Sequence, residues 1–299
     1  MNSNKNTLKN KTFNKRNMSG WILVLPTIIM FIYTVWHPLI VGITDSFCSM
    51  KGFTPTGFVG LKNYAEVVTD TNFAQTFKNT LLYVLWALII AFPLPFICAV
   101  IVNEVRFGQT LFKVLLYLPC VIPAIAVFLL WKFVYLENEG GLLNMIRFFF
   151  GMAPRQWLGD ERIVILCIIV SVAWRSIGTG MIMYLASLQS INKELYEAAR
   201  IDGAGFWGRV KHVLIPHMWG LLLLMAVREM IGVFQITAQP MTMTGGGPNG
   251  ASTSLGYLMY QYAFQFGQVD RSLAVGVIMF ITLMLLTVVY FKLDKKINE

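Results

Sequence analysis

Polar side chains interrupt two of the most apolar segments of the chain. In the segment 163–186, Ser171, Arg175 and Thr179 recur at intervals of four, which places them on one face of a helix. Trp174 lies beside this face. A guanidinium group donates hydrogen bonds and an aromatic ring offers an apolar surface, so these side chains could contact a polar solute. They could equally join neighbouring helices by hydrogen bonds.

A second polar face follows in and just after the segment 217–238. It carries Arg228, Gly232, Gln235 and Gln239. Their spacing again corresponds to one side of a helix, and Glu229 adjoins Arg228. Charged groups inside apolar segments are costly and are therefore candidates for function. Two interpretations stay open: these residues line a solute cavity, or an Arg–Glu pair and hydrogen bonds hold the helices together.

Catalytic and metal chemistry have no counterpart in the sequence. The cysteines and histidines are Cys48, Cys98, Cys120, Cys167, His37, His212 and His217. No CxxC or Cys/His spacing occurs, so we expect neither a disulfide framework nor a metal site. A membrane-embedded enzyme would need a cluster such as paired His and Asp within the apolar segments, and none is present. We expect no catalytic residue.

The composition shows what must position these side chains. The 299 residues are 56% hydrophobic and only 13% charged, whereas soluble domains carry about 25% charged residues. The apolar residues fall into blocks near the length of about 20 residues that crosses a membrane as a helix. The blocks are 20–43, 80–102, 113–135, 163–186, 217–238 and 273–291. We therefore predict an all-α polytopic membrane protein with about six transmembrane helices.

The domain organisation follows from these blocks. A basic tail, 1–18, precedes the first helix, 19–43, which is too long for a signal-peptide core and is expected to be retained. A loop, 44–79, leads to a core, 80–291, with five further helices, and a short tail, 292–299, ends the chain.

The distribution of Lys and Arg predicts the orientation of the chain in the membrane. Both tails and the loop 187–216 are rich in them, whereas the longer loop 239–272 has only Arg271. The positive-inside rule places both termini and the loop 187–216 in the cytoplasm of a cell-membrane protein. The net charge of +9 therefore reflects contact with the membrane, and we expect no nucleic-acid partner.

The loop 187–216 predicts a short helix on this cytoplasmic side. Asn192 is a good N-cap, Glu197, Ala198 and Ala199 favour helix, and Gly203 suits the left-handed position that ends one. A second apolar stripe follows, formed by Phe206, Val210, Val213 and Leu214. Pro216 then introduces the next span. Without further information, these would be two helices lying on the membrane surface.

The spacing of particular residues in this loop resembles the EAA loop of ABC importer permeases. Glu197-Ala198-Ala199 is followed after three residues by Gly203, and later by Val213 and Ile215-Pro216. Val213 and Ile215 stand where the family pattern usually has Ile and Leu. The resemblance implies that Glu197, Ala198, Ala199, Asp202 and Gly203 couple this chain to an ATP-hydrolysing subunit. It also implies the MetI/MalF-like permease fold.

The same resemblance implies the partners and the cofactors. No GxxxxGK[ST] pattern occurs, so the chain has no loop of this kind to hold ATP phosphates, and ATP and Mg would be bound by a separate ATPase. An extracytoplasmic solute-binding protein would deliver the solute, and a second homologous permease subunit would complete a heterodimer in the membrane lipid. This chain would be a transport subunit and no enzyme.

A glycine-rich segment indicates the cargo. Phe234-Gln235 and the run from Met243 to Thr253 resemble the carbohydrate branch of these permeases, the MalF-like branch. Thr237-Ala238 replaces an aromatic-Asp pair that relatives often carry. The resemblance implies import of a sugar or oligosaccharide by alternating access. Another small polar solute, such as glycerol phosphate, is the alternative. An ion-coupled secondary transporter is disfavoured because only Glu229 could relay protons and no internal repeat occurs.

Overall fold

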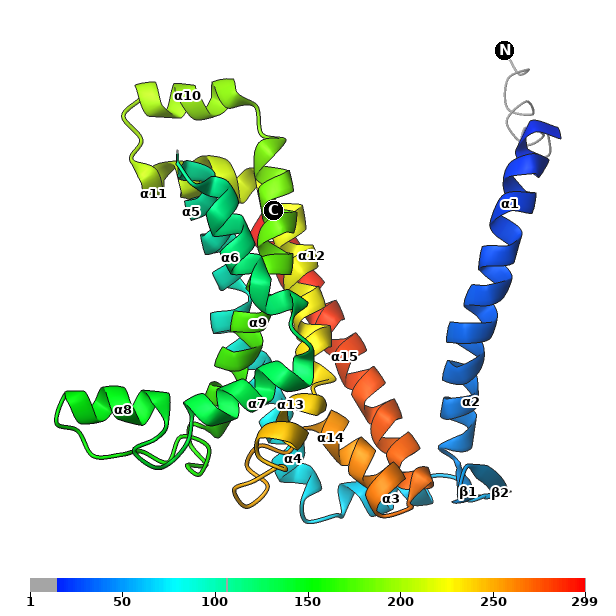
Figure 1. Cartoon of the computed structure of the whole chain (residues 1–299). Helices are drawn as coiled ribbons and strands as arrows, with labels where there is room; N and C mark the ends of the chain where they lie inside the picture. Colours follow the sequence, from blue (N-terminus) through cyan, green and yellow to red (C-terminus); the bar gives the residue numbers. More distant parts are fainter. Residues whose placement is uncertain (1–14, 106, 299) are drawn as a thin grey trace.

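The computed structural model describes residues 15–105 and 107–298, which form helices and one short hairpin (Figure 1). Within these residues, five helices are long and apolar enough to cross a membrane, and one bent pair of helices makes a sixth candidate span. The five helices are Gly20–Asp45, Phe73–Glu104, Val164–Gln189, Phe206–Phe234 and Val269–Lys292. The prediction of an all-α fold with about six spans is confirmed. Residues 1–14 of the predicted tail lie outside the described residues.

The two ends of the molecule carry different elements. α1 (Lys15–Phe31) begins and α15 (Val269–Asn298) ends toward the end that carries α10 (Lys193–Ile201), here called the α10 end (Figure 1). The opposite end, here called the hairpin end, carries β1 (Cys48–Lys51) and β2 (Thr54–Phe58), which pair antiparallel. Also at the hairpin end are α3 (Lys62–Val68), α8 (Leu142–Phe149), α13 (Ala238–Met243) and α14 (Leu255–Tyr260).

Three spans contain a wide π-helical turn that ends two residues before a proline. The turns are Ile32–Trp36 between α1 and α2 (His37–Asp45), Ala87–Ala91 between α4 (Phe73–Trp86) and α5 (Pro93–Glu104), and Val210–Leu214 before α12 (Ile215–Phe234). The prolines that follow are Pro38, Pro93 and Pro216. Proline cannot donate the helical hydrogen bond and crowds the preceding turn, so a wider turn accommodates it. This explains why the fifth span begins at Phe206 in α11 (Phe206–Arg209), and not at the predicted residue 217.

The third predicted span, 113–135, is not one continuous helix. α6 (Gln109–Val121) and α7 (Ala124–Val134) meet at an angle of 99°. Ile122 between them is extended, with φ −68° and ψ 135°, and Pro123 follows it. A residue before proline avoids the helical conformation, which is the physical reason for the break.

The fourth span, α9 (Val164–Gln189), lies at the centre of the bundle. It packs against α4, α5 and α6, and more than half of its apolar window is buried. A Cβ added at Gly178 would lie 2.6 Å from the Cα of Tyr117, and one at Gly180 would lie 2.7 Å from Pro95. Small residues allow this close approach of helix backbones, as is typical of membrane helices.

The first span stands apart from this bundle. No residue in its apolar window is buried, and its contacts to the rest of the chain lie at the hairpin end, where α2 and β1 meet α15 (Figure 1). An apolar helix exposed along most of its length must face lipid or another protein.

Candidate functional site

α10 is a short capped helix that lies across one end of the bundle, with α11 beneath it (Figure 1). Asn192 caps its start, because the backbone N–H of Glu194 donates to the Asn192 side chain at 3.0 Å. At its end Gly203 has φ +80°, and the N–H of Ala204 donates to the carbonyl of Ala199 at 2.9 Å. This hydrogen bond is the wrapping bond of a Schellman motif. The predicted short helix, its N-cap and its terminating glycine are confirmed.

The residues predicted to couple the chain to an ATPase lie together on this element. The side chains of Glu197 and Asp202 are exposed and that of Ala199 is half-buried. Ala198 belongs to α10, but its side chain lies outside the described part of the structure. Apolar side chains are exposed beside them: Leu195 at 55%, Ile201 at 85% and Trp207 at 76%. Large apolar groups exposed next to acidic ones form a surface suited to a protein partner.

The segment that follows α10, which is α11 and the π-helical turn after it, forms the base of α10. It contacts the bundle through an ion pair and apolar packing. The guanidinium of Arg209 lies 3.6 Å from the Glu104 carboxylate at the end of α5 and donates to the carbonyl of Ala204 at 3.1 Å. Val210, Leu214 and the half-buried Phe206 pack into a core shared with α5 and α9. The predicted apolar stripe therefore faces the protein interior. A force applied to α10 would reach α5, α9 and α12 through this base.

The polar face predicted on α9 divides into a buried and an exposed part. Ser171 is buried and donates to the carbonyl of Ile168 at 2.6 Å, so it does not face a cavity. Trp174 is half-buried and meets Trp131 edge-on at 5.9 Å between ring centres. Arg175 is half-buried, and its Nε makes no hydrogen bond within the described residues. Thr179 is exposed. The role of these three residues in a solute cavity stays a prediction.

One stripe of α12 is exposed along its whole length and is more polar than a lipid-facing surface. It consists of His217, Gly220, Leu224, Arg228, Ile231, Gly232 and Gln235. An arginine within a span almost always faces a protein neighbour or a water-filled path. This exposed α12 stripe is therefore a candidate wall of a solute path or an interface with a second subunit. Glu229 is half-buried beside it.

The predicted continuation of this face to Gln239 is wrong. α12 ends at Phe234, Gln235 caps it, and the half-buried Gln239 lies in the separate helix α13. The helix does not continue because Thr237 donates to the carbonyl of Gln235, and because Pro240 has no N–H to donate to the carbonyl of Ile236, which accepts from Ser254 instead. The alternative of an Arg–Glu pair stays open: in the part of the chain that is described, no ion pair within 4.0 Å involves Arg228 or Glu229, but Arg228 still interacts electrostatically with the Glu229 carboxylate.

The glycine-rich segment forms a compact turn that α4 holds in place at the hairpin end. The buried Asn79 amide donates to the carbonyls of Gly250 and Thr253 at 2.8 and 3.1 Å. Tyr83 donates to the carbonyl of Ser252 at 2.9 Å, and Gln75 donates to that of Asn249 at 3.1 Å. Sequence reasoning missed these residues, although Gln75, Asn79 and Tyr83 recur on one face of α4 and the polar character of the first two could have revealed it.

Replacing Asn79 by leucine is expected to destabilise the protein by about 2 kcal/mol. Leucine keeps the branched shape of the side chain, but the buried carbonyl of Thr253 and the half-buried one of Gly250 lose their donor, at about 1 kcal/mol or more each. Thermal unfolding of the detergent-solubilised protein would show a lower midpoint. Gln75→Leu is the matched control, because Gln75 is exposed and its backbone partner can bind water. Equal midpoints for Asn79→Leu and wild type would contradict the structural role of Asn79.

A family model described as "Binding-protein-dependent transport system inner membrane component" matches residues 91–299. The chain is 31% identical to the multiple sugar-binding transport system permease protein MsmF of Streptococcus mutans, over 93% of this chain and 95% of that protein. It is 27% identical to the arabinooligosaccharides transport system permease protein AraP of Bacillus subtilis, over 94% and 90%.

The same fold occurs in a solved structure. A chain of a bacterial ABC transporter involved in the import of the acidic polysaccharide alginate superimposes with a TM-score of 0.81. The match covers 95% of this chain and 98% of that chain, at 23% identity.

Proposed function

The chain belongs to the family of binding-protein-dependent transport system inner membrane components, and from this premise we propose that it is the permease subunit of an ABC importer for a sugar or oligosaccharide. The observation that carries the proposal is α10, a capped and exposed helix that contacts α11 and the following π-helical turn, which in turn pack against α5 and α9. The chain itself would perform no covalent chemistry. α10 would transmit to the spans the energy of ATP hydrolysis by a separate subunit.

A separate ATPase is the proposed partner of α10. The exposed acidic groups of Glu197 and Asp202 can pair with basic side chains, while Ile201 and Trp207 can enter an apolar groove. The sequence contains no phosphate-binding GxxxxGK[ST] pattern, so ATP and Mg belong to that partner. Closure of two ATPase subunits would then move α10, and with it α5, α9 and α12, between outward-open and inward-open states.

A second permease subunit is supported by two exposed surfaces. The apolar side chains of the first span are exposed along most of its length. The exposed α12 stripe carries Arg228 within a membrane span. Both surfaces suit contact with a second, homologous permease chain, and a path for the solute between the two chains would bring Thr179, Arg228 and Gln235 to its wall. Trp174 and Arg175 would also belong to this wall, but they are half-buried and would present less surface to the solute than Thr179, Arg228 and Gln235.

The sugar cargo is supported by the relatives. MsmF and AraP are permease proteins of a multiple sugar-binding system and of an arabinooligosaccharide system, and both align with nearly the whole chain. The hairpin end would face outward and receive the solute from a binding protein. Screening sugars against the cognate binding protein, followed by uptake of the bound sugar by cells with and without this chain, tests the cargo. Uptake that does not depend on the chain would reject it.

Cysteine labelling tests the proposed orientation. Thr56→Cys in the exposed hairpin should react with an impermeant thiol reagent on intact cells, whereas Asp202→Cys after α10 should react only in permeabilised cells. A variant with Cys48, the cysteine of the hairpin strand β1, replaced by serine removes the background. Labelling of Asp202→Cys on intact cells would show that the cytoplasmic placement of α10 is wrong.

A further inference from the structure

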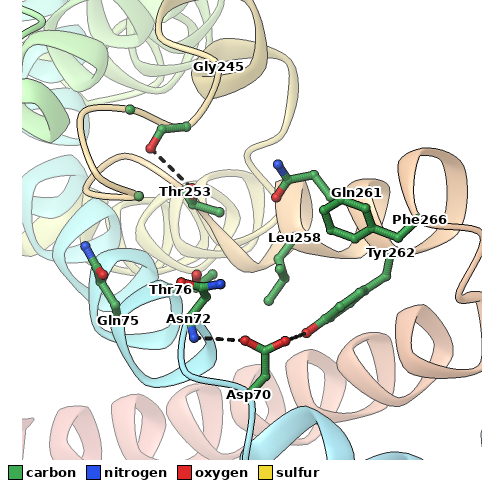
Figure 2. A pocket seen from close by; sticks show the side chains of 13 residues that line it. Asp70, Asn72, Gln75, Thr76, Gly245, Thr253, Leu258, Gln261, Tyr262 and Phe266 are labelled. Carbon is green, nitrogen blue, oxygen red and sulfur yellow. Dashed lines mark hydrogen bonds between the residues drawn. The ribbon is translucent and has the colours of Figure 1, made fainter.

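A cavity of about 340 Å³ lies at the hairpin end, and none of the candidate cavity residues on α9, α12 and α13 lines it. Two distant parts of the sequence form it: the turn into α4 with its first residues, 70–76, and the glycine-rich turn at 245–253 with the nearby residues 258–266 of α14 and the following π-helical turn (Figure 2). Its volume falls in the lower part of the range of about 300–1,000 Å³ for small-molecule sites.

Hydrogen bonds hold the walls of this cavity in place. The Tyr262 hydroxyl donates to one Asp70 carboxylate oxygen at 2.7 Å, and the backbone N–H of Asn72 donates to the other at 2.9 Å (Figure 2). Burial raises the pKa of Tyr262, so its phenol keeps the proton that it donates. Gln75 joins the α4 wall to the glycine-rich turn through the carbonyl of Asn249. The cavity is therefore preformed, which lowers the entropic cost of binding a ligand.

Other groups in the cavity keep unused hydrogen-bonding capacity. The side-chain amides of Asn72 and Gln261 make no hydrogen bond to any residue that the structure describes, and they approach the space from different walls (Figure 2). Tyr262 and Phe266 add aromatic rings, with their centres 6.2 Å apart. Amides that donate and accept, together with aromatic surfaces, match the hydroxyl groups and C–H faces of a sugar ring.

The charge of the lining selects among sugars. Among the described residues that line it, Asp70 is the one carboxylic acid, and none is a lysine or arginine. Arg271, which interacts electrostatically with Tyr262, is paired with Glu66 at 3.0 Å and donates to Gln268 at 3.3 Å. An anionic sugar would meet a carboxylate without a compensating cation, which opposes its binding.

We propose that this cavity is an outer binding site for one or two rings of a neutral sugar, which it holds before the sugar enters the path between the spans. The inference rests on the proposed function, because it takes the hairpin end as the outer face and a sugar as the cargo. Gln261 would be the main polar contact and Phe266 the stacking surface.

Protection of a cysteine from labelling tests this site in the assembled transporter. In cells that carry Cys48→Ser, the reporter Asn72→Cys lies in the cavity, and Thr71→Cys, exposed beside it, is the matched control. An impermeant thiol reagent is applied with glucose, maltose or raffinose at high millimolar concentration, and with glucuronate at the same concentration. At least one neutral sugar should slow labelling of Asn72→Cys several-fold, glucuronate should not, and Thr71→Cys should be unaffected.

A second variant identifies the contact. Adding Gln261→Leu to the reporter should remove the protection, whereas Gln265→Leu, in the same π-helical turn but outside the cavity, should preserve it. Labelling that no neutral sugar slows, or protection that survives Gln261→Leu, would overturn the proposed site. ATP-dependent sugar uptake by the same cells is measured separately: its presence without protection rejects only the outer site, and its absence rejects the proposed function.

Discussion

Replacing Gly203 by proline is expected to abolish transport while leaving the protein inserted in the membrane. Gly203 ends α10 with φ +80°, and proline is fixed near φ −65°, so the turn cannot form. The hydrogen bond from Ala204 to Ala199 would be lost and α10 would change direction relative to α11. Sugar uptake should fall to the level of cells without the chain, while the amount of protein in the membrane stays the same.

A control in the same loop separates the turn from a general effect of mutation. Gly205 has φ −62°, and a Cβ added there meets no atom within 4 Å, so Gly205→Ala should transport normally. Glu197→Lys tests the same docking through charge, since it reverses the charge of an exposed side chain without changing the backbone. Normal uptake by either Gly203→Pro or Glu197→Lys would show that α10 does not transmit the energy of ATP hydrolysis.

Replacing Gly178 by valine should severely destabilise the folded bundle. The new Cβ would lie 2.6 Å from the Tyr117 Cα and 2.8 Å from the Leu116 carbonyl oxygen, so α6 would have to move away from α9. Overpacking typically lowers the free energy of unfolding by about 1–3 kcal/mol. A clash with the backbone should cost more than the lower end of this range. The unfolding midpoint in detergent and the amount of folded protein in the membrane should both fall sharply.

Gly220→Val provides the matched comparison for this prediction. Gly220 lies on the exposed α12 stripe, and no atom lies within 4 Å of a Cβ built there. Its unfolding midpoint should stay close to that of the wild type. Equal stability of Gly178→Val and Gly220→Val would mean that the close crossing of α6 and α9 contributes little to the fold.

Local signals in the sequence were sufficient for α10 and for the number of spans. The Asn192 cap, the left-handed Gly203 and the length of the apolar blocks each depend on residues that are neighbours in the chain. The break at Pro123 was missed, because its flanking residues are as apolar as those of an unbroken span. The proline was visible, but an intact kinked helix is also compatible with proline in a membrane.

Tertiary contacts explain the other differences. After the end of α12 at Phe234, the carbonyl of Ile236 accepts from Ser254 at the start of α14, because Pro240 has no N–H to donate to it. The hydrogen bonds from Asn79 to the glycine-rich turn likewise join residues that are separated by more than half of the chain. Helical periodicity reports only residues on one element, so it could not predict these contacts or the outer cavity that they help to form.

The central claim is that ATP hydrolysis by a separate subunit drives a solute through this chain. The most direct test is uptake of the binding protein's ligand into right-side-out vesicles that contain the whole transporter. We predict uptake when ATP is trapped inside and the proton gradient is collapsed, and none when ATP is depleted and the gradient is kept. Continued uptake without ATP, driven by the gradient alone, would contradict the account.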